Sequence, residues 1–243
     1  MNRLIVIGDV HGCLAELNEL IEKLCLSQTD TLVFAGDLVH KGPDSCGVVR
    51  RVMGLRPCVR NLVVVRGNHE DSAIKHRGRA DIGLELSNDE WQFLGGAPLW
   101  YRDAGRGVLV VHGGIPKDLH ELPEDPDSIW ALSNSKRKLF DRLCRMRYVD
   151  AQTGDFVALN ARKPDDPFWA HGYDGRLGFV VFGHEPFHTK SDLAEFDHAV
   201  GVDLGCVQGN RLAAAVFLDP NNLTYTSVCV RARDMYVPPL DID

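Results

Sequence analysis

Residues that can bind metal ions follow directly after apolar runs at five places in this chain. The fullest example is residues 63–70, VVVRGNHE, in which an amide, an imidazole and a carboxylate follow three valines. An amide oxygen can bind a metal ion, and an imidazole can move a proton near neutral pH. A single stretch of this kind would indicate a strand and a polar turn, but five indicate a shared site. The other four stretches end in Asp9 and His11, in Asp37, in His112 and in His184.

The apolar runs before these residues predict strands of an α/β fold. They are rich in β-branched residues and apolar on both faces, as strands of parallel sheets are. The carboxyl ends of such strands line one crevice, where ligands bind. The predicted strands are residues 4–7, 31–35, 63–65, 107–111 and 177–182.

Helical spacing of apolar residues and capping residues predict helices between these strands. The predicted helices are residues 14–24, 44–53, 88–94 and 135–143. Residues 71–106 otherwise show no clear pattern, and residues 150–167 are predicted to be a long loop of the kind that often covers a site. Residues 200–203, 211–218 and 223–231 predict a strand meander that closes a sheet edge.

The predicted ligands are mixed oxygen and nitrogen donors, too many for one tetrahedral zinc ion. They suit two ions that share a carboxylate, a pair roughly 3.5–4 Å apart that clamps both oxygens of an in-line phosphoryl displacement. Mn is the metal that this donor set favours, with Fe, Zn, Co and Mg as alternatives. The six predicted ligands are Asp9, His11, Asp37, Asn68, His112 and His184.

Composition places the chain among ordinary globular proteins. The 243 residues, 44% of them hydrophobic, predict a single domain over residues 1–243. A net charge of −7 disfavours nucleic acid and acidic membranes, so a polyanionic substrate would need a locally cationic pocket. Seven cysteines without CxxC spacing indicate reduced thiols. We see no secretory signal or membrane-spanning run and therefore expect a cytoplasmic protein.

Five motifs resemble those of the calcineurin-like metallophosphoesterases, in the PPP-type branch that includes the protein Ser/Thr phosphatases. They are GDVHG (8–12), GDLVHKG (36–42), GNHE (67–70), HGG (112–114) and GH (183–184). The resemblance implies a β-sandwich with flanking helices and two metals at the carboxyl ends of its strands. It implies that one metal is bound by Asp9, His11 and Asp37, and the other by Asp37, Asn68, His112 and His184. It also makes His69 the proton donor and Arg66 a phosphate ligand.

The chain departs from the protein phosphatases in the second motif, where His40 and Lys41 replace an Asp and an Arg. The Asp orients the catalytic histidine in those enzymes. Residues 145–148, 168–169 and 202–212 resemble the symmetrical bis(5'-nucleosyl)-tetraphosphatases and their eukaryotic relatives instead. This implies a dinucleoside polyphosphate substrate, with diadenosine tetraphosphate split into two ADP by a metal-bound hydroxide attacking in line. Arg66, Lys41 and Arg147 would absorb charge on the phosphoryl oxygens.

Other functions fit the same residues. A polyphosphate endohydrolase, an mRNA cap hydrolase and a protein Ser/Thr phosphatase use the same chemistry on other substrates. A catalytically dead phosphate-binding scaffold is the alternative outside the enzymes. The sequence does not discriminate oligomeric states.

Overall fold

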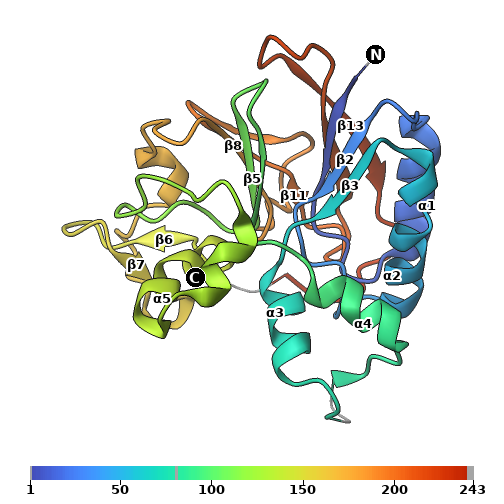
Figure 1. Cartoon of the computed structure of the whole chain (residues 1–243), viewed down its shortest axis with the longest axis horizontal. Helices are drawn as coiled ribbons and strands as arrows, with labels where there is room; N and C mark the ends of the chain where they lie inside the picture. Colours follow the sequence, from blue (N-terminus) through green and yellow to red (C-terminus); the bar gives the residue numbers. More distant parts are fainter. Residues whose placement is uncertain (1, 80–81, 240–243) are drawn as a thin grey trace.

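Two β-sheets pack face to face in the computed structural model, which describes residues 2–79 and 82–239. Sheet A has the order β11-β12-β1-β2-β3, with β13 paired to β12, and sheet B has the order β4-β5-β8-β10-β9. Helices α1 and α2 cover the outer face of sheet A (Figure 1). The predicted α/β sandwich with flanking helices is confirmed.

The helices and strands have the following bounds. The helices are α1 Leu14–Leu24, α2 Ser45–Met53, α3 Asn68–Lys75, α4 Asn88–Gly95 and α5 Asn134–Asp141. The strands of sheet A are β1 Leu4–Ile7, β2 Thr31–Phe34, β3 Asn61–Val64, β11 Asp203–Leu204, β12 Arg211–Phe217 and β13 Tyr225–Arg231. The strands of sheet B are β4 Trp100–Asp103, β5 Val108–Val111, β8 Phe179–Phe182, β9 Ala194–Phe196 and β10 Ala199–Gly201. A small hairpin pairs β6 Tyr148–Val149 with β7 Phe156–Val157.

Strand β1 shows why the apolar runs form buried strands. Its side chains alternate between faces, so Leu4 and Val6 enter the core between the sheets while Ile5 and Ile7 pack under the helices. All four are fully buried. Both faces of the strand therefore require apolar residues, as the sequence predicts.

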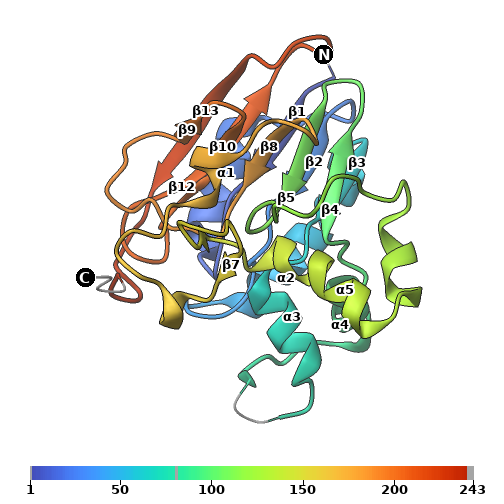
Figure 2. The same cartoon turned by 90° about the vertical axis from the view of Figure 1, so that its left-hand side faces the viewer.

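The five strands that precede the predicted ligands lie in two sheets. Strands β1, β2 and β3 are parallel neighbours in sheet A, and β5 and β8 are parallel neighbours in sheet B (Figures 1 and 2). The crevice at their carboxyl ends is thus formed by both layers of the sandwich.

Three segments differ from their predictions. Residues 200–203 are not one strand, because β10 pairs with β8 in sheet B and β11 pairs with β12 in sheet A. Residues 68–75 form the helix α3 in a region that is mostly without a clear pattern in the sequence. The predicted loop 150–167 contains strand β7, because Asp150 Oδ1 accepts hydrogen bonds from the amides of Gln152 and Thr153 and closes a hairpin turn. The expected meander is confirmed for β12 and β13, which extend sheet A beyond β1.

Among the helices that the structure describes, none is both long enough and apolar enough to cross a membrane.

We expect Gly8→Ala to destabilise the fold where the two sheets meet. A Cβ atom on Gly8 would lie 2.2 Å from the carbonyl oxygen of Val202, and neither backbone can move without disturbing its strand. Overpacking of this kind costs about 1–3 kcal/mol. Gly95→Ala is the control, because Gly95 ends a helix and its Cβ would meet nothing within 4 Å. Urea unfolding should show loss of stability in the first variant only; equal stability would contradict the close approach.

Candidate metal centre

The turns that follow three of the five strands, β1, β2 and β8, hold unusual backbone conformations. Six non-glycine residues in the described ranges have a positive φ, and five of them lie here, the sixth being Cys25 at the end of α1. Such conformations cost free energy and persist where the surroundings enforce them, often at functional sites. The five residues are His11 (φ 46°), Asp37 (φ 53°), His40 (φ 71°), Lys41 (φ 70°) and His184 (φ 70°).

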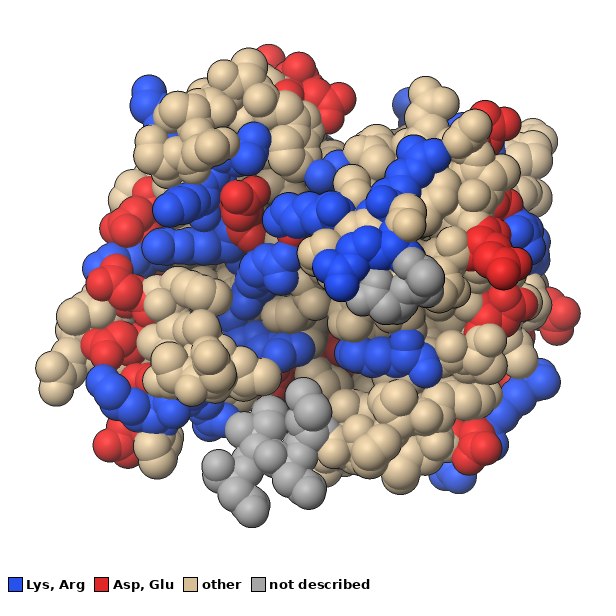
Figure 3. Space-filling model, turned by 90° about the horizontal axis from the view of Figure 1, so that it is seen from below, with Lys and Arg blue, Asp and Glu red and all other residues tan. Residues whose placement is uncertain are grey.

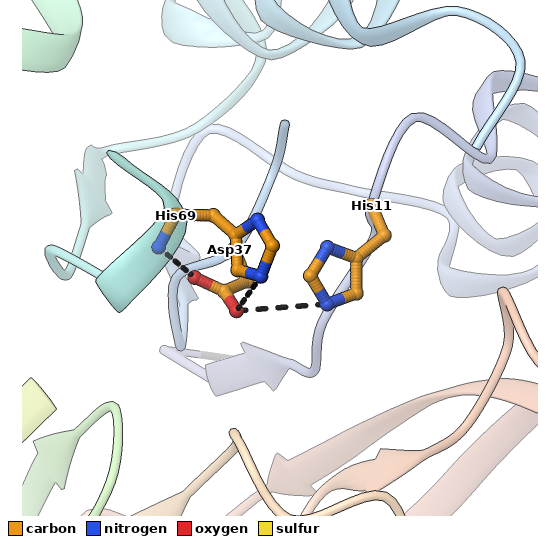
Figure 4. Close-up of side chains that lie close together, drawn as sticks. All are labelled: His11, Asp37 and His69. Carbon is orange, nitrogen blue, oxygen red and sulfur yellow. Dashed lines mark hydrogen bonds and ion pairs between the residues drawn. The ribbon is translucent and has the colours of Figure 1, made fainter. Parts of the chain in front are cut away.

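Asp37 lies at the middle of the site. Its Oδ1 accepts a hydrogen bond from the backbone amide of His69 at 2.9 Å, which fixes the carboxylate (Figure 4). Its Oδ2 faces three imidazoles: it lies 3.5 Å from Nε2 of His11, 3.3 Å from Nε2 of His112 and 4.0 Å from Nε2 of His69. One oxygen is therefore held by the backbone and the other is shared between side chains of both sheets.

His11 and His112 are held in the tautomer that metal binding needs. Nδ1 of His11 lies 3.1 Å from the carbonyl oxygen of Val39, and Nδ1 of His112 lies 2.8 Å from that of Ala35. A carbonyl can only accept, so each Nδ1 carries the proton and donates it. In the neutral ring each Nε2 then has the lone pair that a metal ion needs. Burial lowers the pKa of His112, but the Asp37 carboxylate outweighs burial and raises that pKa above its usual value, so a metal ion would displace a proton there.

All six predicted ligands converge at this place. Asn68 Oδ1 lies 3.0 Å from His112 Nε2, and the rings of His112 and His184 are 4.8 Å apart. The carboxylate of Asp9 accepts from the backbone amide of His184 at 3.1 and 3.2 Å, which joins the two sheets. Within the described residues, two groups of side chains could hold an ion, with ligand atoms within 4.8 Å of one another: His11 with Asp37 and His69, and Asp37 with His112 and His184.

The first of these groups contains His69, where the sequence predicts Asp9. Asp9 Oδ2 lies 3.8 Å from His11 Nε2, so it borders the same space. Asp37 belongs to both groups, which is the arrangement expected of a carboxylate shared by two ions.

The charges of the site fit bound cations. Burial, with Asp203 and Asp37 nearby, raises the pKa of Asp9 well above its usual range. Burial opposes ionisation of Asp37 too, yet His112, His69 and His11 hold its pKa well below the usual range. Burial lowers the pKa values of His11 and His184 far enough to keep them neutral. A neutral imidazole is the protonation state in which His11 and His184 would bind a divalent metal, and a bound cation would favour the ionised form of Asp9.

Lys41 supplies a positive charge at the same place. Its Nζ lies 3.0 Å from Nε2 of His11, and an ammonium group can only donate. It therefore donates to the lone pair that a metal ion would use. A metal on His11 would replace this hydrogen bond and leave the Lys41 ammonium available to an anion.

His69 and His40 are hydrogen-bonded to each other through their ring nitrogens. Their Nδ1 atoms lie 3.0 Å apart, so one must donate and the other accept. Burial lowers the pKa of His69 to about 4 and also lowers the pKa of His40. His40 thus occupies the place of the Asp that the family resemblance leads one to expect, but as a neutral partner.

The two arginines that are predicted to bind phosphate have different surroundings in the structure. Arg147 lies against the site, since its Nη2 donates to the carbonyl of His184 at 2.6 Å. Arg66 is buried: its Nε and Nη2 donate to the carbonyls of Ala97 (3.1 Å) and Gly95 (2.6 Å). The Arg66 guanidinium also stacks on the Trp130 ring at 4.5 Å. Most of the Arg66 side chain is thus engaged by the protein itself.

Two buried acids were missed in the sequence. Glu70 accepts four backbone amides: Oε2 from Asp37 (2.7 Å) and Gly67 (3.0 Å), and Oε1 from Leu38 (2.8 Å) and Val39 (3.3 Å). Asp203 lies close enough to Asp9 to raise the pKa of its carboxyl. A signal for Asp203 was present, since it follows an apolar run just as Asp9 and Asp37 do.

The face around the site is cationic although the chain is acidic overall. Seen from below, the end of the molecule where α3 lies in Figure 1, Lys and Arg side chains gather round a hollow (Figure 3). Among the described residues, Lys41 and Arg147 are cations that contact predicted ligands, namely His11 and His184. The locally cationic pocket that a polyanionic substrate needs is present.

Comparison with known proteins shows the family to which this chain belongs. The family model for calcineurin-like phosphoesterases matches residues 2–209, and the chain belongs to that family. Members of the family are metal-dependent, so the chain is a metal-dependent phosphohydrolase with divalent ions as its cofactors.

Several relatives carry a more particular name. A symmetrical bis(5'-nucleosyl)-tetraphosphatase from Methylococcus capsulatus is 36% identical, over 86% of this chain and 89% of the relative. An asymmetrical bis(5'-nucleosyl)-tetraphosphatase from Oceanobacillus iheyensis is 28% identical, over 87% of each chain. A solved structure described as a candidate diadenosine tetraphosphatase has 30% identity and a TM-score of 0.72, over 95% of this chain and 94% of that one.

We expect Glu70→Gln to weaken both the fold and metal binding. The amide nitrogen cannot accept, so two backbone amides lose their partner at a cost of about 1–3 kcal/mol. Because Glu70 holds the turn that carries Asp37, the change should also displace the Asp37 carboxylate. Mn²⁺ affinity should then fall roughly 10- to 100-fold, the usual effect of losing a group that orients a ligand.

Glu90→Gln is the matched control. Glu90 also accepts a backbone amide, from Ser87 at 2.6 Å, but it lies on α4 and pairs with Arg50. Urea unfolding and Mn²⁺ calorimetry should show lower stability in both variants and weaker metal binding in Glu70→Gln alone. Unchanged Mn²⁺ affinity in a folded Glu70→Gln protein would contradict the positioning role.

Proposed function

We propose that this protein hydrolyses a phosphoanhydride bond of dinucleoside polyphosphates, splitting diadenosine tetraphosphate into two ADP. The observation that carries the proposal is the position of Asp37 Oδ2, which faces imidazoles from both sheets. The face of the molecule at these strand ends is rich in Lys and Arg (Figure 3). The names of the relatives support the substrate class, and they include both symmetrical and asymmetrical cleavage.

The proposed ligands follow the sequence prediction. Asp9, His11 and Asp37 would hold one ion, and Asp37, Asn68, His112 and His184 the other. Mn suits these oxygen and nitrogen donors. When bound, the ions supply Lewis acidity toward the phosphoryl oxygens.

The protein's own cations would hold the transferring phosphoryl group. Lys41 acts as a mobile point charge beside His11, whereas Arg147 is anchored by the carbonyl of His184. Nη1 of Arg66 is the third proposed contact. These groups neutralise charge that the phosphoryl oxygens carry through an in-line displacement.

His69 would protonate the leaving group. With a pKa lowered to about 4 it is neutral in the free protein, and a bound phosphate dianion would raise that pKa by stabilising the imidazolium. A nucleoside diphosphate leaves more easily than an alkoxide or phenolate, so it needs less protonation. Loss of the Asp partner at position 40 is therefore tolerable for this substrate.

Product analysis is the first test. We expect the Mn²⁺-loaded protein to convert diadenosine tetraphosphate to ADP alone, as separated by ion-exchange chromatography. ATP with AMP would also show phosphoanhydride hydrolysis, but with the substrate bound so that it is cleaved asymmetrically. No product, with p-nitrophenyl phosphate still hydrolysed, would overturn the proposed substrate in favour of polyphosphate or phosphoprotein.

Asp37→Asn should abolish hydrolysis of diadenosine tetraphosphate and of p-nitrophenyl phosphate alike, because the shared oxygen loses its charge. Metal content by mass spectrometry should fall with it. Retained activity on either substrate would contradict the central role of Asp37.

His69→Ala should discriminate between leaving groups. We expect kcat for phenyl phosphate, whose phenolate is a poor leaving group, to fall by roughly 10²-fold or more, in the range of general acid catalysis. The loss on diadenosine tetraphosphate should be at least tenfold smaller. Equal losses on both substrates would show that His69 is not the proton donor.

A further inference from the structure

A cavity of about 480 Å³ adjoins the metal centre, and we name it the side cavity. It lies between the turn after β2, helix α3 and the segment 82–84, and its walls include His40, Lys41, Ser45, Ser72, Ile82 and Leu84. The volume falls within the roughly 300–1,000 Å³ of small-molecule sites.

Two wall residues connect the side cavity to the catalytic groups. Lys41 Nζ reaches Nε2 of His11 at 3.0 Å, and His40 Nδ1 meets Nδ1 of His69 at 3.0 Å. The cavity is thus separated from the predicted metal ligands by one layer of side chains. Lys41 thus lines the cavity and also contacts a predicted metal ligand.

The walls suit a nucleoside better than a phosphate chain. Ile82 and Leu84 offer apolar surface for a flat base, and Ser45 and Ser72 offer hydroxyl groups for polar edges. Among the described residues that line the cavity, Lys41 is the one with a permanent charge, and it stands at the end next to the metals. Within the described part of the lining, a chain of phosphates would meet no cation besides Lys41.

The side cavity is formed in advance of binding. Ser45 Oγ accepts from the His40 amide at 2.8 Å, and the Gly42 amide donates to the carbonyl of His11 at 2.8 Å. A Cβ on Gly42 would lie 2.1 Å from that carbonyl oxygen, so the turn is pressed against the metal-binding loop. A fixed wall lowers the entropy cost of binding.

We propose that the side cavity seats one nucleoside of the substrate, whose phosphates pass Lys41 to reach the metals. This rests on the proposed function and deepens it, because it makes the enzyme select 5'-nucleoside phosphates over inorganic polyphosphates. The position of this nucleoside would also decide which phosphoanhydride lies at the metals.

The test compares ADP with inorganic pyrophosphate, which has the same anhydride but no nucleoside. Calorimetry of the Mn²⁺-loaded protein measures both affinities in the wild type and in Ser72→Phe, which fills the cavity from α3. We expect the ratio of ADP to pyrophosphate affinity to fall at least tenfold. Ser227→Phe, on the exposed face of β13, is the matched control and should keep the wild-type ratio.

Ile82→Trp fills the same space from the opposite wall and replaces Ser72→Phe if that variant does not fold. An unchanged affinity ratio in a folded variant of either kind would overturn the proposal. An equal loss for ADP and pyrophosphate would also overturn it, because a general disturbance of the metal site has that effect.

Turnover separates this proposal from the proposed function. If the wild type does not hydrolyse diadenosine tetraphosphate, the proposed function fails, and the ADP measurement still decides whether the cavity binds a nucleoside. If the wild type hydrolyses it and Ser72→Phe does so with unchanged kcat/KM, the function stands and the nucleoside site is wrong.

Discussion

The carboxylate of Glu70 holds the metal centre together. Its two oxygens accept four backbone amides from the turns after β2 and β3, and these turns carry Asp37 and Asn68. Asp37 has a left-handed backbone with φ 53°, which is uncommon for residues other than glycine although aspartate adopts it more readily than most. Burial and the Asp37 charge raise the pKa of Glu70 to about 7, while the amides favour its ionised form. Glu70 is therefore most fully ionised, and accepts these four hydrogen bonds most strongly, when cations offset the negative charge of Asp37.

Much of the fold and most of the site could be predicted from sequence, because both depend on one local pattern. An apolar run that ends in a ligand-type residue identifies a strand and also locates its carboxyl end, which is why Asp9, Asp37 and His184 were found. The assignment of strands to two sheets depends on pairing between distant residues and leaves no local trace. The role of Glu70 was missed because its partners are backbone amides, which every sequence has. The contact between His40 and His69 was missed because it joins two turns that are far apart in the sequence.

The distribution of charge reconciles an acidic protein with the polyanionic substrate that we propose. A net charge of −7 repels anions at long range, whereas the hollow at the strand ends is ringed by Lys and Arg. Salt screens the long-range repulsion within about 8–10 Å, so a small nucleotide is attracted once it reaches the hollow. A long polyanion would also meet the acidic surface beyond it. The charge pattern thus favours compact substrates.

The pairing of β1 with β12 has a consequence for how the protein is made. Strand β1 leaves the ribosome first, but its neighbour β12 is reached only some 200 residues later. At about 5–20 residues per second, the apolar edge of β1 stays unpaired on that side for roughly 10–40 s. His184 is made 175 residues after Asp9, so the set of predicted metal ligands cannot be complete until that residue has been made. Because of this strand order, neither sheet A nor the set of predicted metal ligands can be completed early in synthesis.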